Sequence, residues 1–249
     1  MTDNDITSGD QLAAGVFSSW LREVQGAIRG DNASNVPCGT CTACCTASQF
    51  IHIAPDETDT LSHIPADLLF PAPLLPRGHL LMGFDQRGHC PMLIDNQCSI
   101  YAHRPRTCRT YDCRVFPAAD IYLDDDDNDD DNNSQDYTNN DNNVANDNNV
   151  ANPKFYIAEQ SRRWRFSFPT DNDRLEHAAV IAAASYLSAR RNLLNDGRVA
   201  LDTTHRAVQA IEIHDVFLSR DPTMSAMTII EPDVEAVRVA LSPTPRHQG

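Results

Sequence analysis

The sequence predicts an α+β fold, in which a small irregular cysteine-rich subdomain packs against a mainly helical remainder and carries a disordered acidic insert. Eight cysteines share one turn-rich stretch, whereas the flanking segments place apolar residues at helical spacing. We expect five regions: an N-terminal tail and amphipathic helix (1–33), the cysteine region (34–117), the insert (118–153), a C-terminal mainly helical region (154–242) and a tail (243–249).

The first predicted element is an amphipathic helix over residues 11–29. Its apolar residues recur every fourth position, which places them on one helical face. Gly30 follows directly and is a typical helix stop. The residues on that face are Leu12, Val16, Trp20, Val24 and Ile28.

The cysteine region contains only short predicted elements. Residues 49–53 and 79–84 alternate in the manner of strands, and residues 58–69 indicate a helix or turn. Residues 92–100 predict a tight hairpin, because an Asp-Asn pair separates two short apolar runs.

The insert accounts for most of the acidity. Residues 123–152 contain ten aspartates and no Lys, Arg or Glu, against a net charge of −15 for the whole chain. A segment with few apolar residues and many like charges cannot bury a core, so we expect it to be disordered.

The C-terminal region is predicted to be mostly helical. Residues 154–168 suggest a strand pair, or one strand with a basic, aromatic end. Asp171 or Asn172 is the expected cap of the first of three helices. These helices are expected over residues 173–195, 202–219 and 232–241.

Composition also indicates which compartment the protein occupies and which partners it does not bind. The polar N-terminus lacks the features of a secretory signal, and no apolar run approaches the length of a membrane span. We therefore expect a cytoplasmic protein with no membrane partner. A single basic patch in an acidic chain makes nucleic acid an unlikely partner. In a reducing cytosol, clustered cysteines are more often metal ligands than disulfides.

The cysteines begin with the run Cys38-x2-Cys41-x2-Cys44-Cys45. Thiolates are soft ligands that suit zinc and iron–sulfur clusters, and ferredoxins present three thiolates to a cluster at this spacing. We expect a metal ion or cluster as the partner, either an iron–sulfur cluster or iron, or alternatively zinc. The predicted ligands are Cys38, Cys41, Cys44, Cys45, Cys90, Cys98, Cys108 and Cys113.

The division of these ligands is open. Adjacent cysteines rarely serve one ion, so Cys44 and Cys45 are expected to face different centres, or one of them is spare. A distant Cys-Pro can close a cluster, which makes Cys90 the candidate fourth ligand for Cys38, Cys41 and Cys44. The other four would form a second set. Other divisions, or the use of only four cysteines, remain open.

Several neighbours are candidate supporting groups. Arg104 and Arg109 can offset thiolate charge and donate hydrogen bonds to the sulfurs, so we predict that they contact the bound cofactor. His89 and His103 lie near cysteines in the sequence and are weaker ligand candidates. The basic run at residues 162–165 can close over the same region or bind an anion.

The joint motif resembles the CxxCxxCC cysteine-cluster family, also described as YkgJ-like. The resemblance covers residues 38–116 and rests on the cysteine run, Gly88-His89-Cys90-Pro91 and the segment from Cys98 to Cys113. It implies that all eight cysteines belong to the motif and that zinc, iron or an iron–sulfur cluster is bound. Flagellin lysine methylases are similar in cysteine pattern, which keeps an enzymatic role open.

Three functions compete at this point. The chain is a binding or electron-transfer module, a metal- or cluster-dependent modifying enzyme, or a metal storage or delivery protein. A purely structural metal, as in a zinc ribbon, is a further alternative. The sequence contains no phosphate-binding loop, dinucleotide fingerprint or hydrolase triad.

Overall fold

The computed structural model contains helices and several small sheets, which confirms the α+β class. Nearly all of the expected acidic insert and the whole expected C-terminal tail lie outside the described residues. No helix in the described part of the chain is both long and apolar enough to cross a membrane. The described residues are 11–34, 36–73, 75–122, 153–190, 203–220 and 227–242.

The N-terminal segment is a strand followed by a helix rather than one helix. Strand β1 (Leu12–Val16) pairs in parallel with β7 (Trp164–Ser167), and α1 (Phe17–Arg29) begins directly after it. The predicted start at residue 11 is therefore wrong, because pairing with a distant strand overrides the local helical pattern. The predicted stop is confirmed: Gly30 ends α1 in the left-handed conformation, with φ of 87°.

The segment over residues 154–168 is also different from the prediction. Its first part forms helix α5 (Pro153–Arg163), and only the last part forms strand β7. Ile157 and Gln160 are buried on one side of α5, where the helix packs against the cysteine run. The expected strand pair is wrong because this packing stabilises a helix. The alternative, one strand with a basic, aromatic end, is confirmed in part by β7.

Helix α6 (Asp171–Ala189) is the longest described helix, and Thr170 caps it. The Thr170 hydroxyl accepts a hydrogen bond from the Asp173 backbone N–H at 3.2 Å, and Asp173 accepts one from the Thr170 backbone N–H at 2.9 Å. This reciprocal capping box replaces the expected cap at Asp171 or Asn172. The expected end of this helix, beyond residue 190, lies outside the described residues.

The remaining C-terminal elements are short. The region expected as one helix over residues 202–219 divides into three elements where it is described. These elements, with the two that follow, are helix α7 (Thr203–Ile213), the 3-10 turn η4 (His214–Phe217), strand β8 (Leu218–Arg220), strand β9 (Met227–Ile229) and helix α8 (Val234–Ala240). Strand β8 pairs antiparallel with β9.

The cysteine region contains two small antiparallel sheets. The order of the three-stranded sheet is β2-β4-β3, with β2 (Ile51–Ile53), β3 (Leu69–Pro71) and β4 (Leu80–Met82). The predicted hairpin is formed by β5 (Leu93–Ile94) and β6 (Gln97–Cys98). Asp95 and Asn96 have φ of 49° and 58°, as a tight hairpin turn requires.

Short helical turns connect these strands. The run expected as a helix or turn over residues 58–69 contains helix α2 and the turn η2. The turns of the cysteine region are η1 (Ala43–Thr46), α2 (Thr58–His63), η2 (Ala66–Leu68), η3 (Tyr101–His103), α3 (Arg106–Thr110) and α4 (Val115–Ala118).

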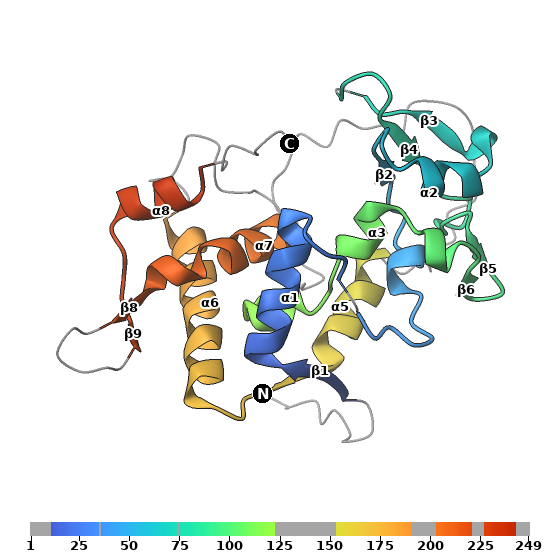
Figure 1. The fold of residues 1–249 in the computed structure, drawn as a ribbon. Helices are drawn as coiled ribbons and strands as arrows, with labels where there is room; N and C mark the ends of the chain where they lie inside the picture. Colours follow the sequence, from blue (N-terminus) through green and yellow to red (C-terminus); the bar gives the residue numbers. More distant parts are fainter. Residues whose placement is uncertain are drawn as a thin grey trace, which may run out of the picture.

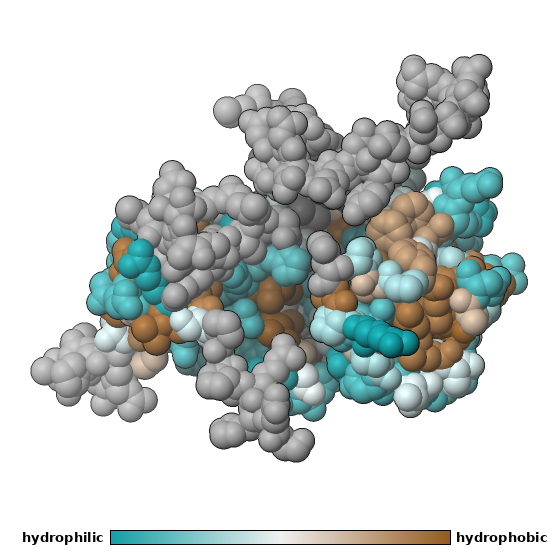
Figure 2. Space-filling model, turned by 90° about the horizontal axis from the view of Figure 1, so that it is seen from above, coloured by the Kyte–Doolittle hydropathy of each residue, from teal (hydrophilic) through white to brown (hydrophobic). Residues whose placement is uncertain are grey.

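Two hydrophobic clusters stabilise the fold. The larger lies among α1, α4, β7, α6 and α7 and includes Phe17, Trp164 and Leu187. The smaller lies under the three-stranded sheet and includes Ile53 and Met82. In Figure 1 the helices α1, α6, α7 and α8 lie toward one side and the sheet lies at the other end, with α3 and α5 between them. Hydrophobic surface also gathers at the sheet end (Figure 2).

Candidate metal centre

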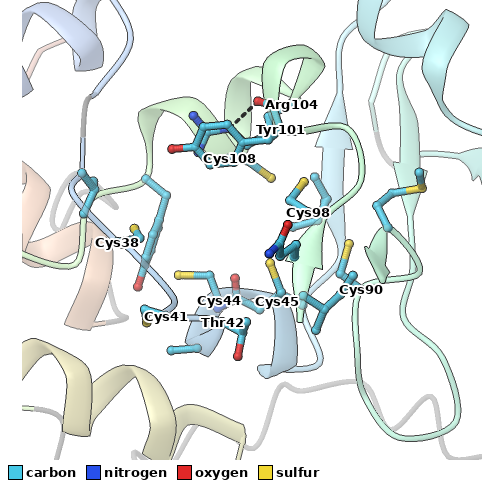
Figure 3. A pocket seen from close by; sticks show the side chains of 18 of the residues that line it. Cys38, Cys41, Thr42, Cys44, Cys45, Cys90, Cys98, Tyr101, Arg104 and Cys108 are labelled. Carbon is cyan, nitrogen blue, oxygen red and sulfur yellow. Dashed lines mark hydrogen bonds between the residues drawn. The ribbon is translucent and has the colours of Figure 1, made fainter. Parts of the chain in front are cut away.

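All eight cysteines line one cavity of about 730 Å³ between the two hydrophobic clusters. Cys113 is buried, the other seven are half-buried, and all eight are free thiols. Figure 3 shows the sulfurs around the cavity, with Cys38, Cys41 and Cys44 on one side and Cys45, Cys90 and Cys98 on the other. The structure therefore brings together every cysteine that the sequence singled out.

Backbone hydrogen bonds position the first side of the cavity. The Cys41 N–H donates to the Cys38 carbonyl at 2.9 Å, which folds the start of the motif into a tight turn. The Ser34 N–H donates to the Arg109 carbonyl at 2.7 Å, and the Ser34 hydroxyl donates to Asp112 at 3.0 Å. These contacts hold Ser34, just before Cys38, against the segment that leads into Cys113.

A second pair of backbone contacts positions the other side. The Cys90 N–H donates to the Cys45 carbonyl at 2.7 Å, and the Ser48 N–H donates to the Gly88 carbonyl at 3.0 Å. Gly88 has φ of 79°, and a Cβ there would collide with the Ser48 hydroxyl. Only glycine permits this close approach, which places Cys45 beside Cys90.

The thiols fall into two sets of four. Cys44 and Cys45 are adjacent on the 3-10 turn η1, where successive side chains diverge by about 120°. Among the thiols, Cys113 and Cys38 act most strongly on Cys44, whereas Cys90 and Cys98 act most strongly on Cys45. The first set is Cys38, Cys41, Cys44 and Cys113, and the second set is Cys45, Cys90, Cys98 and Cys108.

The hydrophobic clusters give the same division. Cys41 and Cys113 pack with the larger cluster, whereas Cys90, Cys98 and Cys108 pack with the smaller one. The grouping expected from the sequence, with Cys90 completing the first set, does not agree with these positions. In the structure Cys113 takes that place, and the separation expected for Cys44 and Cys45 is present.

Comparison with known families agrees with this cysteine arrangement. Residues 37–143 match the CxxCxxCC family model. The model is described as a "Putative zinc- or iron-chelating domain", and the match confirms the resemblance read from the motif. It covers less than half of the chain. Searches of curated proteins and of solved structures found no significant match.

Burial favours the neutral form of several thiols in the cavity. Burial, followed by neighbouring thiols, raises the pKa of Cys45 and Cys108 to about 12. Burial likewise raises the pKa of Cys113 to about 12, against a hydrogen bond from Trp164 that lowers it. Thiolates crowded into this cavity therefore need a compensating positive charge. A metal ion or cluster supplies that charge and displaces the protons when it binds.

The two predicted arginines occupy different places relative to the cavity. Arg104 lines the cavity and stacks over the Tyr101 ring at 3.7 Å. Burial raises the pKa of both Cys38 and Cys108, and the Arg104 charge partly offsets that rise. Arg104 therefore acts on both sets. Arg109 does not line the cavity, and its guanidinium lies 3.9 Å from the buried carboxylate of Glu57. His89 and His103 do not line it either.

Residues beyond the matched range complete the cavity wall. Ile157 and Gln160 from α5 and Trp164 from β7 line the side opposite the sheets. The Trp164 indole N–H donates a hydrogen bond to Cys113 Sγ at 3.2 Å. The sequence offered one signal, since the basic run at residues 162–165 was expected to close over the cysteines. Of that run only Trp164 lines the cavity.

The spacing of the sulfurs tests which cofactor fits. All eight cysteines lie in described ranges, and no three of their sulfurs come within 4.8 Å of one another. Around a single zinc ion, with Zn–S bonds of about 2.3 Å, no two sulfurs can be more than about 4.6 Å apart. No three of the sulfurs are therefore as close together as the ligands of one zinc ion. A cluster of several iron and sulfide atoms is larger than a single ion, so its cysteine ligands lie farther apart.

Proposed function

We propose that this chain is an iron–sulfur protein, in which the two sets of four cysteines hold two clusters in one cavity and serve as a redox centre. The observation that carries the proposal is the wide spacing of the sulfurs around a cavity of about 730 Å³. The family description, zinc- or iron-chelating, supports the metal class and is compatible with iron.

The charge environment supports a bound cluster. Cluster thiolates carry negative charge, and Arg104 lies where it acts on a thiol of each set. The Trp164 indole donates a hydrogen bond to Cys113 Sγ, and such a bond to a ligand sulfur would tune the potential of a bound cluster. The free thiols are consistent with a reducing compartment, and we propose the cytoplasm.

Anaerobic purification followed by elemental analysis tests the proposal. We expect a brown protein with iron and acid-labile sulfide in similar amounts, and a broad visible absorption that bleaches on chemical reduction. A colourless protein that retains zinc and lacks sulfide would overturn the iron–sulfur assignment and favour a structural zinc site. Rapid loss of metal to a mild chelator would favour storage or delivery instead.

Replacing Trp164 is expected to change the redox properties of the first set. In Trp164→Phe the aromatic ring remains, but Cys113 loses the indole N–H that stabilises negative charge on its sulfur. Reduction adds negative charge to a cluster, so the potential should become more negative. Potentiometric titration of the visible spectrum measures this shift.

Trp20→Phe is the matched control for this variant. Trp20 is equally buried, and its indole N–H donates to Asp112 Oδ2 at 2.9 Å rather than to a sulfur. It should lose stability without a comparable shift in potential. Equal potentials in the wild type and Trp164→Phe would contradict the role given to this hydrogen bond.

A further inference from the structure

A second group of metal-binding side chains lies on the surface, outside the cysteine cavity. Asp59 and His63 are one helical turn apart on α2, so both side chains project from the same face. His103 belongs to η3, which packs beside α2. The potential ligand atoms of all three residues lie within 4.8 Å of one another.

The geometry of this trio is compact. His103 Nδ1 lies 2.8 Å from Asp59 Oδ2, and His63 Nδ1 lies 3.9 Å from Asp59 Oδ1. The two imidazole rings stack with centroids 3.6 Å apart and an angle of 8° between their planes. The side chains of Asp59, His63 and His103 are 72 %, 39 % and 38 % exposed, so an ion can reach them from solvent.

The chemistry of the trio suits a transition metal. Imidazole nitrogen is a preferred ligand of zinc, nickel and copper, and a carboxylate completes many such sites. The hydrogen bond from His103, together with the histidine charges, holds the pKa of Asp59 below its ordinary value. Its carboxylate is therefore ionised and available as a ligand at neutral pH.

We propose that Asp59, His63 and His103 form a surface site for a divalent transition-metal ion such as Zn²⁺, separate from the cysteine cavity. Three protein ligands leave one tetrahedral position for water. The site needs no cysteine, so it stands whether or not the cavity holds clusters.

Binding requires small local changes. The stacked rings must turn so that both nitrogens point at one ion. His63 Nδ1 must also give up its contacts with the Asp59 carbonyl at 2.8 Å and the Ser62 hydroxyl at 3.1 Å. These groups are exposed, so water replaces the lost hydrogen bonds at little cost.

The ion would join two parts of the cavity rim. Turn η3 begins with Tyr101, which lines the cavity together with Arg104. Helix α2 already touches this segment, because the Thr60 hydroxyl donates to the Arg104 carbonyl at 3.5 Å. A metal held by Asp59, His63 and His103 therefore fixes α2 to the segment that carries Arg104.

Equilibrium dialysis against Zn²⁺ tests the proposal on the full chain as purified, with its metal content measured beforehand. We expect the wild type to bind one more zinc ion than His63→Gln or His103→Gln at the same free zinc concentration. Asp59→Asn should weaken that extra site by about tenfold or more, since even losing a group that only supports a ligand costs that much. All these proteins carry the same eight cysteines, so the difference isolates the surface site.

His79→Gln is the matched control. His79 also stacks on a second histidine, His52, with their ring nitrogens 2.8 Å apart, but this pair belongs to no such trio within the described residues. The control should bind as much zinc as the wild type. If His63→Gln and His103→Gln also match the wild type, the proposed site does not exist.

Discussion

A protein carrying Cys38→Ala and Cys113→Ala together is expected to keep about half of the wild-type metal, because four cysteines hold one cluster. Pairing Cys38→Ala with Cys90→Ala should instead remove nearly all of it. In the structure Cys38 and Cys113 belong to one set, whereas Cys90 belongs to the other. Iron and sulfide per chain, measured after anaerobic purification, give the result directly.

The two double variants are controls for each other. Each removes two cysteines, one of them Cys38, so general damage to the cavity affects both. The grouping first read from the sequence predicts the reverse order, with the Cys38 and Cys90 pair retaining half of the metal. Equal losses in the two proteins would contradict both groupings and indicate a single shared centre.

The spacing of the cysteines along the sequence predicted the metal site, but not which cysteines group together in it. The run from Cys38 to Cys45 and the later Cys-Pro are visible in the sequence, and all eight cysteines line the cavity. Which of them meet depends on contacts between distant segments. The Ser34 N–H to Arg109 carbonyl bond places Cys113 with the first cysteines, and the Cys90 N–H to Cys45 carbonyl bond places Cys90 with the second set.

The same limit explains the errors in the fold. The hairpin around Asp95 and Asn96 was predictable because its turn residues are adjacent. Strand β1 was not, since Leu12 to Val16 have helical spacing and become a strand only by pairing with β7, about 150 residues away. Trp164 was missed as a cysteine partner for that reason, because β7 and α5 lie beyond the insert.

Replacing the buried carboxylate of Asp112 is expected to give the largest loss of stability. Arg114 donates to both oxygens of Asp112, at 2.7 to 3.1 Å, and both side chains are almost fully buried. Asp112 also accepts from the Trp20 indole, which ties α1 to the cysteine region. Asp112→Asn keeps the shape but leaves Arg114 without its counter-charge, at a cost of about 3–5 kcal/mol in the free energy of unfolding.

Asp56→Asn is the control, because Asp56 pairs with Arg106 at 2.6 Å in an exposed position. Denaturant unfolding should show a much smaller loss for this exposed pair, because solvent screens its charges. Equal losses in the two variants would mean that the buried network does not stabilise the fold. Asp112 and Arg114 flank Cys113, so an Asp112→Asn protein that still folds should lose metal from the first set and keep it in the second.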